Sequence, residues 1–246
     1  MSSLLTGIAV VIAVVLTFTY QKMPIPNSSS YEVVRITQPI TIDGQWDKPA
    51  WKKIPALPIS YHMGDQPGFK PVVEAKMQYD QANLYVIFRV QDQFVRVLTQ
   101  NINGPVWKDA CVEFFFAPQT SQPAHYFNLE INAGGIPLMQ YSTGEQKNVS
   151  LPTESIQTIE IAHSLPSRID PEIRDSVVWT LEYRVSLDML EQHAEVTRPK
   201  PGVVWRANFY KIAENSSNPH YLTWAPVDLP KPNFHTPRFF GELHFR

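Results

Sequence analysis

Cysteine is nearly absent from this chain: Cys111 is the only one among 246 residues, so no disulfide can form within it. A single cysteine inside an apolar strand is usually an inert core residue, and we favour that interpretation over a catalytic nucleophile. Basic residues are also few, since 21 Lys and Arg stand against 23 Asp and Glu, for a formal net charge of −2. Nucleic-acid binding needs concentrated Lys and Arg, so we expect no nucleic-acid partner.

Several catalytic and metal signatures are missing as well. The seven histidines show no H-x-x-x-H or H-x-H spacing, which argues against a transition-metal site. The chain has no G-x-S-x-G nucleophile motif and no glycine-rich phosphate loop. Asp43, Asp47, Asp80 and Asp92 lie near predicted turns where calcium could bind, but their spacing matches no calcium loop. Turn capping is their simpler role, so the residues alone indicate no metal site.

Glycine is scarce relative to proline, with 10 Gly against 22 Pro. This balance favours rigid turns over long helices. Aromatic residues are plentiful instead: 6 Trp, 10 Tyr and 13 Phe suit a β-sandwich core and leave some rings for a binding surface. The length fits one large all-β domain or two small ones.

The N-terminal region is separable from the rest. Residues 4–20, LLTGIAVVIAVVLTFTY, carry no charge, and a Pro- and Ser-rich segment follows them. Such a run is intermediate in length between a signal-peptide core and a minimal transmembrane helix. We interpret residues 1–21 as an export signal or an uncleaved membrane anchor, and residues 22–32 as a linker. The domain at 33–246 is then expected outside the cytoplasm: periplasmic, at the cell surface or secreted.

The remaining chain alternates between short apolar strands and turns rich in Pro and Gly. Residues 72–79 and 84–90 read as a hairpin. Residues 46–51 suggest one helical turn, and 186–193 form the one convincing helix, beginning at a serine cap. Further strands are predicted at 111–116, 126–132, 136–141, 157–162, 177–185, 203–210 and 242–245. This pattern predicts an all-β fold, an antiparallel, jelly-roll-like β-sandwich with one short helix.

The segment WKDACVEFFF, residues 107–116, contains the strongest candidate for a binding site. Its apolar strand is interrupted only by Glu113, which a strand places on the face opposite Val112 and Phe114. An isolated buried carboxylate is costly, so Glu113 must lie at an edge or be paired. Trp107 follows a Gly-Pro turn and should leave its ring free, where it could stack on a pyranose beside the acid. On these residues alone, however, a core strand flanked by a core tryptophan is favoured.

Several stretches carry a resemblance to a known family: ITIDGQWDKPAW, YDQANLYVIFRVQD, WKDACVEFFF, YFNLEINAGG, and WRANFYKI with HYLTWAPVDLPKPNFHTPRFFGEL. In this order, from about Ile36 to Phe245, they resemble family 9 carbohydrate-binding modules and bacterial carbohydrate-binding family 9-like proteins. The resemblance implies a β-sandwich that binds sugars, often glycan ends, in a slot between two aromatic rings. It also implies glycoside hydrolase partners, and it makes a structural calcium ion possible.

In the family's slot, the first ring and its acidic neighbour correspond to Trp107 and Glu113. The second ring, a Trp ahead of a P-x-x-F-G ending, falls on Phe234, which can still stack with less area and no N–H donor. The family's Arg-x-Asn pair falls on Glu130 and Asn132. The arginine is therefore lost, and the family's monosaccharide preference cannot be carried over.

Glu113 and Glu130 should lie close together if their strands pair, and such a pair would prefer a cation or a shared proton. Arg206 and Lys211 are candidates for that cation. His235 should lie in a loop near the slot, where a hydrogen bond to a sugar and structural loop packing are equal alternatives.

We favour a non-catalytic protein that binds a mono- or oligosaccharide in glycan breakdown or uptake. The expected sugar-binding residues are Trp107, Glu113, Glu130, Asn132, Phe234 and His235. Two alternatives stay open. The first is a glycoside hydrolase that uses Glu113 and Glu130 as its acid/base pair, and the second is a structural or adhesion sandwich without a sugar ligand.

Overall fold

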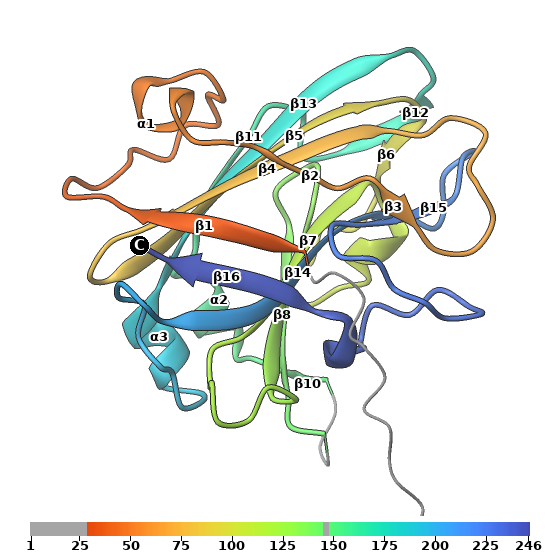
Figure 1. The fold of residues 1–246 in the computed structure, drawn as a ribbon. Helices are drawn as coiled ribbons and strands as arrows, with labels where there is room; N and C mark the ends of the chain where they lie inside the picture. The colour runs from red at the N-terminus through yellow and green to blue at the C-terminus, as the bar shows by residue number, and fades with distance from the viewer. Residues whose placement is uncertain (1–28, 145–147) are drawn as a thin grey trace, which may run out of the picture.

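The computed structural model describes residues 29–144 and 148–246 (Figure 1). The predicted export signal or anchor, residues 1–21, lies outside the described residues, as does most of the predicted linker. Strand β1 (Ser30–Arg35) begins at Ser30, so the last three residues of the predicted linker belong to the fold. In the described part of the chain, no helix is long and apolar enough to cross a membrane.

Strand β1 joins two sheets into one continuous hydrogen-bonded path. Its first residues pair in parallel with β16 (Gly241–Phe245), and its last two pair in parallel with β4 (Val72–Tyr79). The other strand pairings among the described residues are antiparallel. The chain thus forms the predicted β-sandwich, with β1 as the parallel exception.

The first sheet carries the candidate site. Its strands run in the order β10 (Val149–Ser150), β9 (Pro137–Ser142), β8 (Tyr126–Asn132), β7 (Cys111–Ala117), β14 (Val204–Ala213), β16 and β1, with β15 (His220–Thr223) beside β14 and β3 (Tyr61–His62) beside β15.

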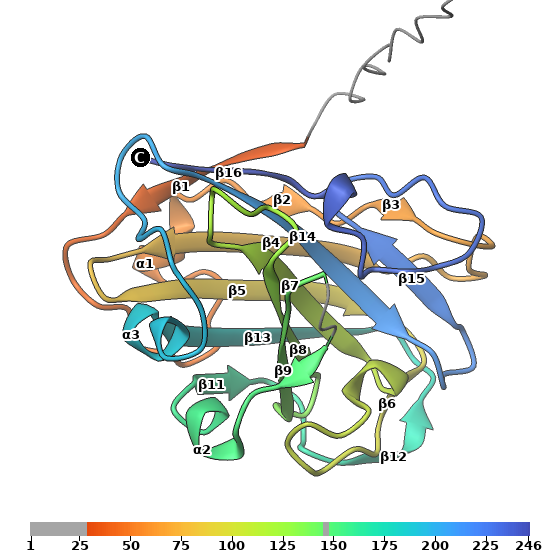
Figure 2. The same cartoon turned by 90° about the horizontal axis from the view of Figure 1, so that it is seen from below.

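The second sheet continues from β1. Its strands run in the order β4, β5 (Asn83–Asp92), β13 (Val177–Ser186) and β11 (Glu160–His163), with β2 (Leu57–Pro58) beside β4. A separate pair is formed by β6 (Val95–Val97) and β12 (Ile169–Ile173). In Figure 2, strands β7, β8 and β14 run obliquely across β4, β5 and β13.

The described residues include three α-helices, all short. The predicted helix at 186–193 is confirmed as α3 (Leu187–Glu191), where the Ser186 side chain accepts a hydrogen bond from the Met189 N–H as its cap. The predicted turn of helix at 46–51 appears as α1 (Pro49–Lys52). The third, α2 (Thr153–Ile156), lies between the strands predicted at 136–141 and 157–162.

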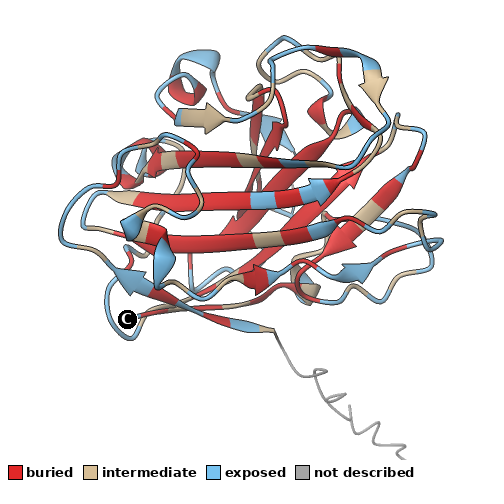
Figure 3. Cartoon of the chain, turned by 90° about the horizontal axis from the view of Figure 1, so that it is seen from above, coloured by how far each residue is buried: buried red, intermediate tan, exposed pale blue. Residues whose placement is uncertain are grey.

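Alternation along β7 separates two apolar clusters. Val112, Phe114 and Phe116 point between the sheets into the main core, whereas Cys111 and Phe115 point to the outer face of the first sheet. Burying an apolar side chain of this size contributes about 1.5–3 kcal/mol. Figure 3 shows the buried residues concentrated along the strands.

The outer face of the first sheet is therefore covered, chiefly by the loops that precede β16. Phe234 and Phe240 come from these loops and pack in the same cluster as Cys111. Cys111 is fully buried, as the sequence predicted for an inert core cysteine. This second apolar layer supports a pocket on the outer face.

Candidate functional site

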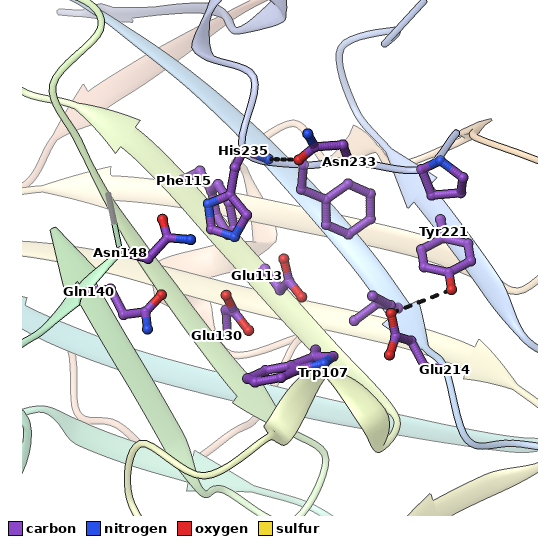
Figure 4. A pocket seen from close by; sticks show the side chains of 13 residues that line it. Trp107, Glu113, Phe115, Glu130, Gln140, Asn148, Glu214, Tyr221, Asn233 and His235 are labelled. Atoms are coloured by element: carbon purple, nitrogen blue, oxygen red, sulfur yellow. Dashed lines mark hydrogen bonds between the residues drawn. The ribbon is translucent and has the colours of Figure 1, made fainter. Parts of the chain in front are cut away.

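A pocket of about 330 Å³ opens on the outer face of the first sheet. Five of the six predicted site residues line it: Trp107, Glu113, Glu130, Phe234 and His235. Figure 4 shows the side chains of Glu113 and Glu130 between Trp107 on one side and Asn233 and His235 on the other. The pocket thus has a ring at one wall, carboxylates at its floor, and the loop that carries Phe234 at the opposite wall.

The two predicted rings are held in different ways. Trp107 lies on the short 3-10 helix η1 (Val106–Lys108) and is partly exposed. Phe234 is only 7% exposed and stacks on Tyr210 of β14, with ring centroids 4.0 Å apart and an interplanar angle of 11°. Tyr221 meets Phe234 edge-on at 6.2 Å. Trp107 therefore offers the freer ring, while Phe234 presents a wall backed by other aromatics.

Asn132, which was predicted to contact the sugar, does not line the pocket. It is fully buried, and its Nδ2 donates to Thr99 O at 3.1 Å and to Asp109 Oδ2 at 3.0 Å. Its Oδ1 accepts from the Ile136 N–H at 2.9 Å. Asn132 lies on the same strand face as Glu130, but the segment around η1 covers that end of the face.

The role of Asn132 is instead to hold the segment that carries Trp107. Asp109, just after η1, accepts hydrogen bonds from the backbone N–H groups of Leu98 at 3.0 Å and Thr99 at 2.9 Å, in addition to the Asn132 amide. These bonds fix both ends of the turn before β7. The orientation of Trp107 therefore depends on an internal polar network under it.

The two glutamates on the pocket floor face each other across the pairing of β7 and β8, with Glu113 opposite Glu130. They are 2% and 4% exposed, respectively. Burial raises the pKa of Glu113 well above its ordinary value, and the charges of Glu130 and Glu214 raise it further, with Lys211 opposing the shift. Burial also raises the pKa of Glu130 to about 7, against a hydrogen bond from the Asn128 amide to Oε1 at 2.9 Å.

The cations predicted for this pair are engaged elsewhere. Lys211 follows Tyr210 on β14, so it points to the opposite face, where its Nζ lies 3.1 Å from Asp92 Oδ2. Arg206 lies 3.7 Å from a carboxylate oxygen of Glu242. Neither lines the pocket. In the described part of the chain, the buried Oε2 of Glu113 has no hydrogen-bond partner.

Comparison with known proteins agrees with this arrangement. The sequence profile described as carbohydrate-binding family 9 matches residues 48–245. This chain belongs to carbohydrate-binding family 9. No curated protein matches it.

Solved structures give the same fold. A Bacteroides uniformis ATCC 8492 protein to which carbohydrate binding has been assigned superposes with a TM-score of 0.79 at 26% identity, over 89% of this chain and 100% of its own. A family 9 module from Caldicellulosiruptor kristjanssonii, solved in complex with cellotriose, superposes with a TM-score of 0.60 at 16% identity, over 89% of this chain and 94% of its own. A family 9 module from the same organism, solved in complex with glucose, superposes with a TM-score of 0.60 at 14% identity, over 89% of this chain and 96% of its own.

The sequence left two alternatives open for His235 in this family 9 chain: a place at the sugar slot and structural packing within a loop. The surroundings of His235 fit both. It lines the pocket, and its Nδ1 lies 3.0 Å from the Tyr126 hydroxyl. Its ring packs against Phe115 at 5.0 Å. Burial lowers the pKa of His235 to about 4, so the imidazole is neutral at neutral pH.

Other pocket residues were missed by sequence reasoning. Glu214, just after β14, lies 3.4 Å from the Tyr221 hydroxyl, and both line the pocket. Gln140 accepts a hydrogen bond from the Asn128 amide at 3.2 Å and reaches the pocket from β9. The alternation of β8 could have indicated Asn128, two residues before Glu130, which does not line the pocket but donates to both Glu130 and Gln140. Glu214 and Tyr221 had no local signal, because only the packing of distant loops brings them to the pocket.

The resemblance made a structural calcium ion possible, but the described residues include no candidate group of ligands for it. Across residues 29–144 and 148–246, no group of three or more His, Cys, Asp or Glu side chains is arranged to hold a metal ion. Two of the aspartates considered from the sequence cap turns. Asp43 Oδ1 accepts from the Gln45 N–H at 2.9 Å, and Asp80 Oδ1 accepts from the Asn83 N–H at 2.7 Å.

Proposed function

We propose that this family 9 chain is a non-catalytic carbohydrate-binding protein that holds a sugar ring between Trp107 and Phe234. The observation that carries the proposal is a partly exposed tryptophan in one pocket with the buried Oε2 of Glu113, which has no hydrogen-bond partner among the described residues. A pyranose has apolar C–H faces that suit an aromatic ring, and hydroxyls that donate to a carboxylate. Such a ligand supplies a hydrogen bond that Glu113 Oε2 does not receive from the described residues.

Pocket size supports a small ligand. A volume of about 330 Å³ lies at the lower end of the range of roughly 300–1,000 Å³ that is usual for small-molecule sites. We therefore favour a monosaccharide or the end of a glycan over a long internal segment. The related modules were solved with cellotriose and glucose, so glucose-based sugars are the first ligands to test.

Calorimetric titration with a panel of mono- and oligosaccharides tests the proposal. Trp107→Ala should weaken binding by about 2 kcal/mol or more, roughly 30-fold, because the ring is an aromatic anchor. Trp46→Ala is the matched control: this ring is also partly buried, but it packs on the second sheet beside Lys76. Unfolding curves show whether each variant is folded. Equal affinities in both variants, or no binding by the unmutated protein, would refute the proposal.

Hydrolysis by Glu113 and Glu130 is the competing outcome. The same sugars should remain intact after long incubation with the protein. If chromatography finds shorter products, and if Glu113→Gln abolishes their formation, the pocket is catalytic and the binding proposal is wrong.

We also propose that the domain acts outside the cytoplasm, in glycan breakdown or uptake. The support is the uncharged run at residues 4–20 ahead of a Pro- and Ser-rich segment. In a bacterial host, the full chain should appear in the membrane or extracytoplasmic fraction, whereas a chain that begins at Ser29 should stay in the cytoplasm. Equal distribution of the two chains would contradict this localisation.

A further inference from the structure

Among the described residues, the charged side chains that line the pocket are all acidic. Three carboxylates line it, those of Glu113, Glu130 and Glu214. No Lys or Arg is among the described residues of its wall. His235, the remaining basic side chain there, is held neutral at neutral pH by burial, which lowers its pKa to about 4. The described residues therefore offer negative charge and no compensating cation at this site.

The two floor carboxylates also have few hydrogen-bond donors among the described residues. Glu130 Oε1 receives the Asn128 amide at 2.9 Å. Glu113 Oε2 is buried and, among the described residues, receives nothing. Because Glu113 lies directly opposite Glu130, both carboxyl groups occupy the same small region of the sheet face (Figure 4). Two buried carboxylates side by side need a proton or a cation between them, and no Lys or Arg among the described residues lines this pocket.

We propose that the pocket selects sugars that carry a protonated amino group over neutral and acidic sugars. The proposal rests on the proposed function and names its ligand class. A ring ammonium carries three N–H donors and one positive charge, so it donates to Glu113 and Glu130 together while the sugar face stacks on Trp107. A hydroxyl in the same place donates one hydrogen bond and neutralises neither carboxylate. A sugar carboxylate adds a further negative charge to the floor.

Matched disaccharides separate these chemistries. The β-1,4-linked disaccharide of glucosamine differs from cellobiose by an ammonium in place of the 2-hydroxyl of each ring, and its N-acetylated form keeps the nitrogen but loses the charge. In calorimetric titrations at pH 7, the glucosamine disaccharide should bind at least tenfold more tightly than both neutral disaccharides, because charge-assisted hydrogen bonds are about twice as strong as neutral ones. Glucuronate should bind more weakly than glucose.

Variants that remove one charge test whether the preference for an ammonium group depends on Glu130. Glu130→Gln removes one floor charge and should bring the affinity ratio of the glucosamine disaccharide to cellobiose close to one. The control Glu160→Gln also removes one negative charge, from an exposed ion pair with Arg184 on the second sheet, and should keep the ratio of the unmutated protein. A ratio that falls equally in both variants would mean that only net charge matters, and would overturn the proposal.

The outcomes also distinguish this inference from the proposed function. If neutral sugars bind as tightly as the glucosamine disaccharide, the inference is wrong and sugar binding stands. If no sugar of any charge binds, the proposed function itself is wrong. Calcium that binds to the protein and displaces the glucosamine disaccharide would assign the carboxylates to a metal ion and overturn the inference.

Discussion

The buried carboxyl group of Glu130 should make the free energy of unfolding depend on pH, and the substitution Glu130→Gln should remove this dependence. The pKa of its buried carboxyl rises from 4.5 to about 7. A shift of one pKa unit corresponds to about 1.4 kcal/mol, so the difference is worth on the order of 3 kcal/mol. Because this acid ionises more readily in the unfolded chain, its share of stability is fully present below pH 4.5 and is lost as the pH rises through 7.

The substitution Glu130→Gln tests this magnitude. The glutamine keeps a carbonyl oxygen that can accept the Asn128 amide, now bonded to Glu130 Oε1 at 2.9 Å, but it has no proton to lose. Relative to the unmutated protein, the variant should therefore gain on the order of 3 kcal/mol between pH 4.5 and pH 8. Loss of the repelling charge also makes Glu113 easier to ionise, which acts in the same direction.

Urea unfolding followed by tryptophan fluorescence, at several pH values between 4.5 and 8, measures this difference. Glu160→Gln is the control, because its carboxylate is exposed and paired with Arg184, and its difference from the unmutated protein should stay nearly constant with pH. A constant difference for Glu130→Gln as well would show that Glu130 ionises normally in the folded protein. The account of a strained carboxylate pair would then be refuted.

Two further predictions concern the surroundings of the pocket. Asn132→Ala should cost about 1–3 kcal/mol and weaken sugar binding several-fold without removing a sugar contact, because the Asp109 network then holds Trp107 less firmly. Unchanged affinity in the folded variant would show that Trp107 does not depend on this network. Cys111→Ser should cost about 1–3 kcal/mol in urea unfolding and leave sugar affinity unchanged. Rapid modification of Cys111 by a thiol reagent in the native protein would contradict its burial.

Local periodicity accounts for the parts of the fold that the sequence predicted well. The alternation of β7 and β8 places apolar side chains on one face, and it placed Glu113 on the opposite face from Val112 and Phe114 before any partner strand was known. The parallel pairing of β1 with β16 had no such signal. Its partners lie about 200 residues apart in the chain, and no local pattern specifies that contact.

The candidate site depends on contacts that local sequence patterns do not predict. The two-residue period of a strand places Asn132 on the same face as Glu130, but it does not predict which end of that face a loop covers. Lys211 was expected beside Glu113, but the register of β14 sets Tyr210 opposite Glu113 and turns Lys211 to the other face. Register between distant strands depends on the whole sheet. The sequence therefore indicated Trp107 and the carboxylates, but not their complete surroundings.

Another buried glutamate explains why the pocket pair indicates function. Glu182 lies fully buried on β13, and its oxygens accept hydrogen bonds from the Gly44 N–H at 2.7 Å, Lys48 Nζ at 2.8 Å and Trp51 Nε1 at 2.8 Å. The chain itself satisfies that carboxylate, so it stabilises one fold and has no need of a ligand. Glu113 is nearly as buried but keeps an oxygen without a partner among the described residues, beside a second acid and an open pocket. A buried acid pair costs stability, and its presence beside an open pocket supports the proposed binding site, in which a ligand supplies the hydrogen bonds that offset this cost.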